Sequence, residues 1–164
     1  MSIARVPDEM WQRGRPVAVD VLWRLATLFV IAVPLNYLWE LGESPLYAPP
    51  GQLADMFWHC FVASLGDGVL VGAIYVICAV SFRQVDWYVR MSAARYAAML
   101  SAGITAGVLV EWAALWAHRW TYADAMPLLP ALHVGLVPVL QMLVLPPLIF
   151  LIAKGLPSVQ STPG

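Results

Sequence analysis

The sequence is short of charge. Only 12% of its 164 residues are Asp, Glu, Lys or Arg, whereas 61% are hydrophobic. A soluble domain carries about 25% charged residues, so this chain lacks the charge that would solvate a globular surface. We therefore predict one polytopic membrane domain with the lipid bilayer as its main solvent. The formal net charge of −1 provides no basic surface, so we expect no nucleic-acid partner.

Cysteine is scarce as well. Cys60 and Cys78 are the only two, and on one helix they would lie about 27 Å apart, which excludes a disulfide between them. No Cys-x-x-Cys or clustered Cys/His motif is present, so the sequence requires no metal or other cofactor. A four-helix membrane cytochrome can bind haem through two histidines. His59 and His133 are the candidates for that alternative.

Long hydrophobic runs stand where the charge is missing. Each of four runs is long enough to cross a hydrocarbon core of about 30 Å as a helix. We predict an all-α polytopic protein with transmembrane helices at about 21–41, 56–82, 96–117 and 132–153. These form a transmembrane domain (19–154), between a basic cytoplasmic lead (1–18) and a disordered cytoplasmic tail (155–164).

Prolines and glycines interrupt these runs. Pro34 is expected to kink the first helix, and three prolines are expected to break the fourth, namely Pro138, Pro146 and Pro147. Two GxxxG pairs lie in the second and third runs, Gly68 with Gly72 and Gly103 with Gly107. Such pairs let two backbones approach closely. We expect the two pairs to meet each other within the chain, with a homo-oligomer or larger complex as the alternative.

The basic residues predict an orientation. Lysine is almost absent, and Lys154 is the single example among nine basic residues. If the N-terminus is cytoplasmic, every basic residue except Arg119 lies on the cytoplasmic side, as the positive-inside rule requires. An even number of crossings then puts both termini inside. We predict a multi-pass protein of the bacterial inner (cytoplasmic) membrane.

Three carboxyl groups lie inside apolar runs: Asp67, Glu111 and Glu40. An ionised group at bilayer depth costs at least about 2.5–3.5 kcal/mol, so these residues are catalytic candidates. Asp67 is near mid-membrane without a basic partner, which predicts that it is protonated or hydrogen-bonded to Gln141 or Asn36. The structural alternatives are that Glu111 pairs with Arg119 or His118, and that Glu40 reaches the membrane surface.

Further polar and aromatic groups gather around these acids. Helical spacing places them in the outer half of the membrane, where we expect a ligand-binding pocket. The predicted ligand-binding residues are Asn36, Tyr47, His118, Arg119, Trp120, Tyr122, His133 and Gln141.

Several segments resemble uncharacterised small four-helix integral membrane proteins of bacteria. They are NYLWELGESPLY, ASLGDG, and EWAALWAHRWTYADAMPLLP followed by VGLVPVLQ, and they cover most of residues 36–141. A more distant similarity is to membrane enzymes of the lycopene-cyclase and carotenoid-hydratase types. Those enzymes place an intramembrane acid before a W-x-Y element and a proline, matched here by Glu111, Trp120, Tyr122 and Pro127. Their paired acids after the proline are absent, and Gln141 stands in that region.

The leading functional hypothesis is a membrane protein that binds an apolar or amphiphilic, isoprenoid-like molecule in the outer-half pocket. Acid–base chemistry by the intramembrane carboxyl groups would act on that molecule. One alternative is a non-enzymatic subunit or assembly factor of a larger membrane complex. Another is a proton-coupled carrier or a haem-binding membrane protein.

Overall fold

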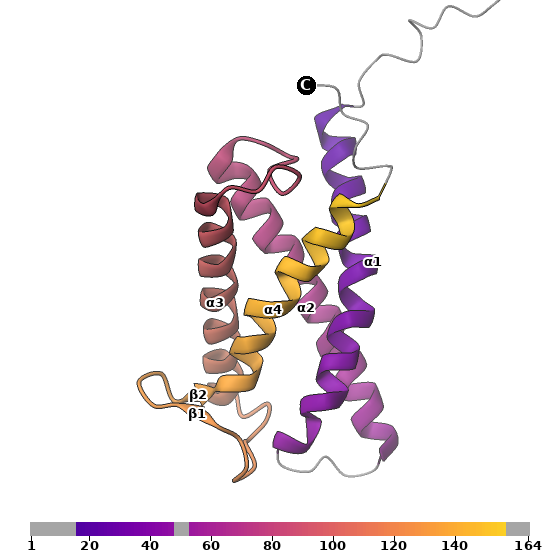
Figure 1. Cartoon of the computed structure of the whole chain (residues 1–164). Helices are drawn as coiled ribbons and strands as arrows, with labels where there is room; N and C mark the ends of the chain where they lie inside the picture. Colours follow the sequence, from indigo (N-terminus) through magenta and orange to yellow (C-terminus); the bar gives the residue numbers. More distant parts are fainter. Residues whose placement is uncertain (1–15, 48–52, 157–164) are drawn as a thin grey trace, which may run out of the picture.

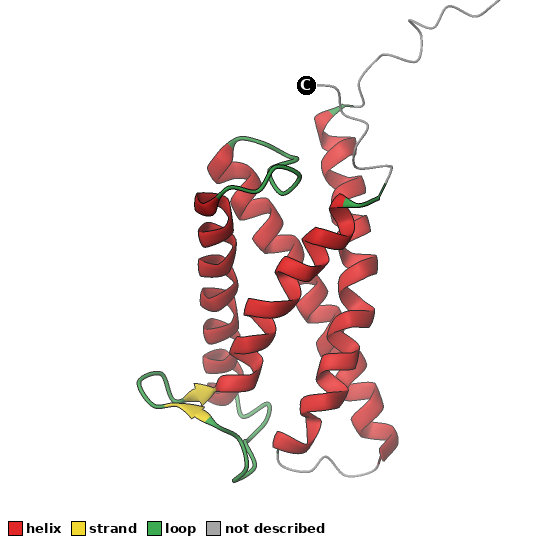
Figure 2. Ribbon diagram, in the orientation of Figure 1, coloured by secondary structure: helices red, strands yellow, loops and turns green. Residues whose placement is uncertain are grey.

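The computed structural model describes residues 16–47 and 53–156. It is mostly helical (Figures 1 and 2), with α1 at Val17–Glu43, α2 at Leu53–Phe82, α3 at Ala93–Trp116 and α4 at Leu136–Lys154. All four helices are long and apolar enough to span a membrane, which confirms four candidate spans within the described residues. Most of the predicted lead and tail lies outside the described residues.

The connection between α3 and α4 is not helical. Two short antiparallel strands, β1 (Leu128–Leu129) and β2 (Val134–Gly135), form a hairpin before α4 begins. The prediction that the fourth helix starts at 132 is therefore wrong by one turn. His133 lies in the hairpin turn with a positive φ of 56°, a conformation that a helix does not contain. We call the end of the bundle that carries this hairpin the hairpin end.

The internal prolines do not interrupt the helices. α1 runs continuously through Pro34, and α4 continues through all three of its prolines. The predicted break of the fourth helix is therefore wrong. Pro138 lies in the first turn of α4, where a backbone N–H has no partner within the helix. Pro146 removes one internal hydrogen bond, and this leaves the Met142 carbonyl without its usual donor.

That carbonyl lies against α3. A Cβ atom on Gly103 would stand 2.5 Å from Met142 O, and one on Gly107 would stand 3.2 Å from Met142 Cγ. Gly68 packs against α1 instead, where a Cβ would lie 2.9 Å from the Phe29 ring. The predicted meeting of the two glycine pairs is therefore wrong. Each pair does form a close contact within the chain, one with α4 and the other with α1.

The bundle is densely packed at the end opposite the hairpin. Loop 83–92 joins α2 to α3 there and inserts Trp87 and Tyr88 among Tyr75 and Phe150, all of them buried. Arg24 is buried beside them, 2.9 Å from Asp20 Oδ2, and donates to Tyr88 Oη at 3.2 Å. Aromatic packing and this ion pair fill one end of the bundle. The polar cavity described below lies toward the other.

Candidate functional site

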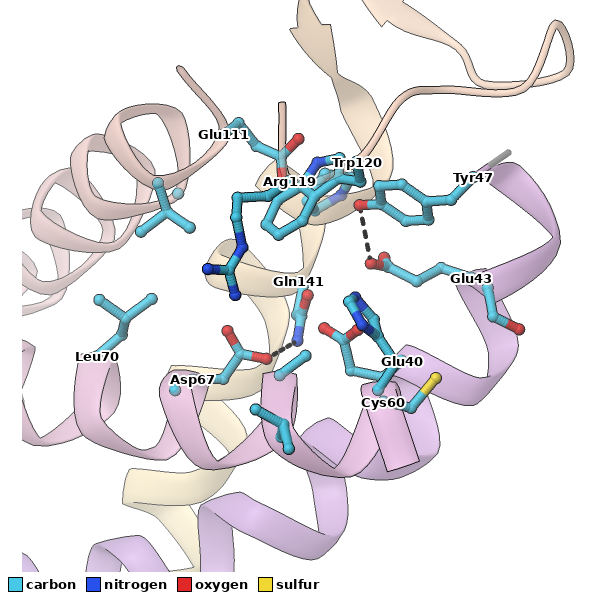
Figure 3. A pocket seen from close by; sticks show the side chains of 18 of the residues that line it. Glu40, Glu43, Tyr47, Cys60, Asp67, Leu70, Glu111, Arg119, Trp120 and Gln141 are labelled. Carbon is cyan, nitrogen blue, oxygen red and sulfur yellow. Dashed lines mark hydrogen bonds between the residues drawn. The ribbon is translucent and has the colours of Figure 1, made fainter. Parts of the chain in front are cut away.

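A cavity of about 770 Å³ lies between the helices toward the hairpin end. All four helices line it, together with the segments that follow α1 and α3. Its volume falls within the roughly 300–1,000 Å³ typical of small-molecule sites. The predicted residues that line it are Glu40, Tyr47, Asp67, Glu111, His118, Arg119, Trp120 and Gln141. Figure 3 shows the labelled side chains facing one another across this space.

The end of the cavity is closed by two segments that pair with each other. Tyr47 forms an isolated β-bridge with Tyr122, and Ala123 N donates to Leu46 O at 3.0 Å. The Tyr47 ring also contacts the Trp120 ring edge-on, with centroids 6.0 Å apart. We call these two segments, residues 44–47 after α1 and residues 118–123 after α3, the lid. Their pairing connects the end of α1 to the end of α3.

A buried amide connects three helices at the base of the cavity. Gln141 Nε2 on α4 donates to Asp67 Oδ2 on α2 and to Asn36 Oδ1 on α1, each at 2.9 Å. Asn36 donates in turn to Ala32 O at 2.9 Å. The predicted hydrogen bond between Asp67 and Gln141 is therefore present. Asn36 does not line the cavity itself but supports the residue that does.

Glu40 of α1 and Asp67 of α2 both line the cavity and lie on either side of Gln141 (Figure 3). Ionised carboxylates only accept hydrogen bonds, so a hydrogen bond between two carboxyl groups requires a proton on one of them. Two like charges beside one cavity in an apolar surrounding also disfavour double ionisation. The pair is therefore suited to holding one proton at the cavity wall.

Two further carboxyl groups are held by aromatic donors. Glu43 accepts from Trp39 Nε1 at 2.8 Å and from Tyr47 Oη at 3.2 Å. Glu111 accepts from the Tyr122 hydroxyl, whose oxygen accepts from Gly135 N at 2.9 Å. Burial raises the pKa of both phenols, so each remains a protonated donor.

The predicted ionic partners of Glu111 are not its partners in the structure. Among residues 16–47 and 53–156 the only ion pair within 4 Å joins Arg24 and Asp20, and Tyr122 takes the place expected for Arg119 or His118. Arg119 instead extends into the cavity (Figure 3). The Trp120 indole Nε1 lies toward Glu111 but is buried without a well-formed hydrogen bond in the described part of the chain.

Two of the three histidines share the cavity, and the third does not. His59 and His118 line the cavity, whereas His133 lies exposed in the hairpin turn and does not line it. Within the described ranges, no group of three or more His, Cys, Asp or Glu side chains could hold a metal ion. His59 and His133, the pair named for the haem alternative, therefore do not line a common cavity.

The candidate residues derived from sequence omit two titratable groups that line the cavity, Glu43 and Cys60. Glu43 shares the helical face of Glu40, one turn further on, and that spacing was the available signal. Cys60 shares a face of α2 with Asp67, two turns away, but a lone buried cysteine usually serves as small-residue packing.

His118 adopts a left-handed backbone conformation with φ 52°, and so does Arg83 with φ 51°. Both close a helix in the same way, as shown by Arg119 N donating to Ala114 O at 2.9 Å and Gln84 N to Ala79 O at 3.0 Å. Glycine is the residue that this position favours. We expect His118→Gly and Arg83→Gly each to raise the free energy of unfolding by about 0.5–1 kcal/mol.

Thermal unfolding in detergent measures the stability of both variants relative to wild type. A loss of stability in both would contradict the strain argument. A gain for Arg83→Gly alone would indicate that the His118 side chain makes a stabilising contact at the cavity.

No protein-family model matches the chain, and searches of curated proteins and of solved structures found no significant match.

Proposed function

We propose that the chain is an inner-membrane protein that binds an apolar or amphiphilic molecule in the cavity and transfers a proton to or from it. One observation carries the proposal: two carboxyl groups, Glu40 and Asp67, face a ligand-sized cavity among helices that are long and apolar enough to span a membrane. Acids at such depth are expensive to bury, and a general acid needs the protonated form that this environment favours.

The distribution of basic residues supports an orientation for this site. With both termini in the cytoplasm, loop 83–92 with its arginines lies inside and the hairpin end lies outside. The cavity then belongs to the outer half of the membrane. A ligand there is shielded from the cytoplasm by the packed end of the bundle.

The lining residues support a division of roles. Glu40 and Asp67 hold the transferable proton, and Gln141 fixes Asp67 by a 2.9 Å hydrogen bond. Glu111, held by Tyr122, is a second acid in the cavity wall. Tyr47 and Trp120 cover the ligand with aromatic surface.

The test compares Glu40→Gln, Asp67→Asn and the double variant with wild type in the native host. Each protein is purified gently, and mass spectrometry identifies the lipids, pigments and metals that accompany it, while whole-cell lipid extracts report substrate and product. We expect an apolar species to accompany the wild type. In the double variant we expect either its loss or a substrate-to-product ratio raised at least tenfold.

The matched control is Asp124→Asn, which neutralises an exposed acid outside the cavity. It is expected to behave as wild type. Unchanged ligand occupancy together with an unchanged lipid profile in the double variant would rule out the proposed function.

A further inference from the structure

The cavity wall is incomplete between α2 and α3. Val62, Gly66 and Leu70 of α2 line the cavity on one side of this gap, and Gly107 and Val110 of α3 line it on the other. Val62 is nevertheless 46% exposed and Val110 is 37% exposed. Residues that both line a cavity and face the outside lie at its opening.

Gly66 lies in this opening without a packing partner. A Cβ atom there would meet nothing within 4 Å, whereas one on Gly68, two residues further along α2, would meet Phe29. The absence of a side chain at Gly66 therefore serves no helix contact in the described structure. It leaves the opening wider than any other residue would.

With the four helices spanning a bilayer, as proposed above, the opening faces hydrocarbon. Its residues all lie within the spanning stretches Asp55–Phe82 and Ala93–Trp116. Figure 1 shows α2 and α3 joined by the loop at one end and spreading apart toward the hairpin end. A molecule that reaches the cavity this way comes from the bilayer itself.

The polar wall behind the opening accepts hydrogen bonds. Four carboxyl groups line the cavity, from Glu40, Glu43, Asp67 and Glu111. The groups that can donate beside them are the guanidinium of Arg119, the imidazoles of His59 and His118 and the indole N–H of Trp120. Several donors nearby are already used, because the Gln141 amide, the Tyr47 hydroxyl and the Tyr122 hydroxyl all donate to these acids. A ligand head that donates a hydrogen bond complements these carboxyl oxygens, whereas a carboxylate head would only add a fifth acid to the wall.

We propose that a long-chain lipid with a hydrogen-bond-donating head, an alcohol or an amine, enters sideways from the bilayer between α2 and α3. It passes Gly66, places its head against Asp67 and Glu40, and leaves its chain along Val62, Leu70 and Val110. This inference rests on the proposed function and adds the route of entry and the class of head group.

The test uses photoreactive probes in liposomes that contain the purified protein. The probes are an 18-carbon alcohol with a diazirine in its chain, and the amine and the carboxylic acid of identical chain. Labelled peptides are mapped by mass spectrometry. We expect the alcohol or the amine to label the cavity segments of α2 and α3 at least tenfold more than the acid does.

The entry route is tested with Gly66→Trp. Its control is Gly42→Trp, because Gly42 is also an exposed helical glycine with nothing within 4 Å of a Cβ, but lies on α1 and does not line the cavity. We expect at least a tenfold loss of alcohol labelling in Gly66→Trp and none in Gly42→Trp. Val62→Trp narrows the same opening and replaces Gly66→Trp if that variant unfolds.

Equal cavity labelling in wild type, Gly66→Trp and Val62→Trp would overturn the lateral route, and acid labelling as strong as that of the alcohol would overturn the head-group class. Either result leaves the proposed function standing if Glu40→Gln/Asp67→Asn still changes the lipid profile. An unchanged lipid profile in the Glu40→Gln/Asp67→Asn variant would instead contradict the proposed function itself.

Discussion

Alanine at Gly103 is expected to lower the free energy of unfolding by about 1–3 kcal/mol, toward the upper end of that range. Its Cβ would stand 2.5 Å from the Met142 carbonyl oxygen, which is backbone and cannot rotate away. Relief would require α3 and α4 to separate, and the contact of Gly107 with Met142 one turn along would be lost with it. Unfolding in SDS-containing mixed micelles measures the change.

Gly42→Ala is the matched control. Gly42 is a helical glycine with nothing within 4 Å of a Cβ. Alanine at this position is therefore expected to stabilise the protein by about 0.5–1 kcal/mol through helix propensity alone. The two substitutions are chemically identical and opposite in predicted sign. A Gly103→Ala variant as stable as Gly42→Ala would show that α3 and α4 do not meet at Met142.

The number of spans and the crowding of acids at one end were predictable from sequence because both are local properties. A run of about 20 apolar residues indicates a membrane span whatever it packs against. A carboxyl group within such a run is easily recognised as a candidate, because placing its charge in the bilayer costs free energy. The same reasoning led to the hydrogen bond between Asp67 and Gln141. An acid without a basic partner needs a neutral donor, and few polar residues lie at its depth.

Packing partners were not predictable in the same way. A GxxxG pair indicates that a backbone approaches but not which one, so Gly103 was assigned to α2 rather than α4. The partner of Glu111 was also missed, because Tyr122 reaches it only after the chain has reversed beyond α3. The hairpin was missed for a similar reason, since the sequence LHVG at 132–135 fits a helix start as well as a short strand. Tertiary pairing with Leu128 and Leu129 decides between them.

Gln141→Met is expected to lower the free energy of unfolding by about 1–3 kcal/mol. Methionine keeps the length and volume of glutamine but removes the amide that joins three helices. Asn36 Oδ1 and Asp67 Oδ2 would each lose a donor at 2.9 Å, and Gln141 and Asn36 are almost fully buried, so water does not readily replace it. The control is Ser81→Ala, whose exposed hydroxyl donates only to Ile77 O of its own helix and whose loss should cost less than about 0.5 kcal/mol.

A double-mutant cycle separates the contribution of the hydrogen bond between Gln141 and Asn36 from that of general packing. Asn36→Leu alone leaves Gln141 with one acceptor fewer, and the combined Asn36→Leu/Gln141→Met variant removes both partners of the same bond. The free energy of unfolding should therefore fall less in the double variant than the sum of the two single decreases, by about 0.6–1.7 kcal/mol. Strictly additive losses would mean that the two side chains act independently. Gln141 would then hold Asp67 alone, and α1 would contribute to the cavity only through Glu40 and Glu43.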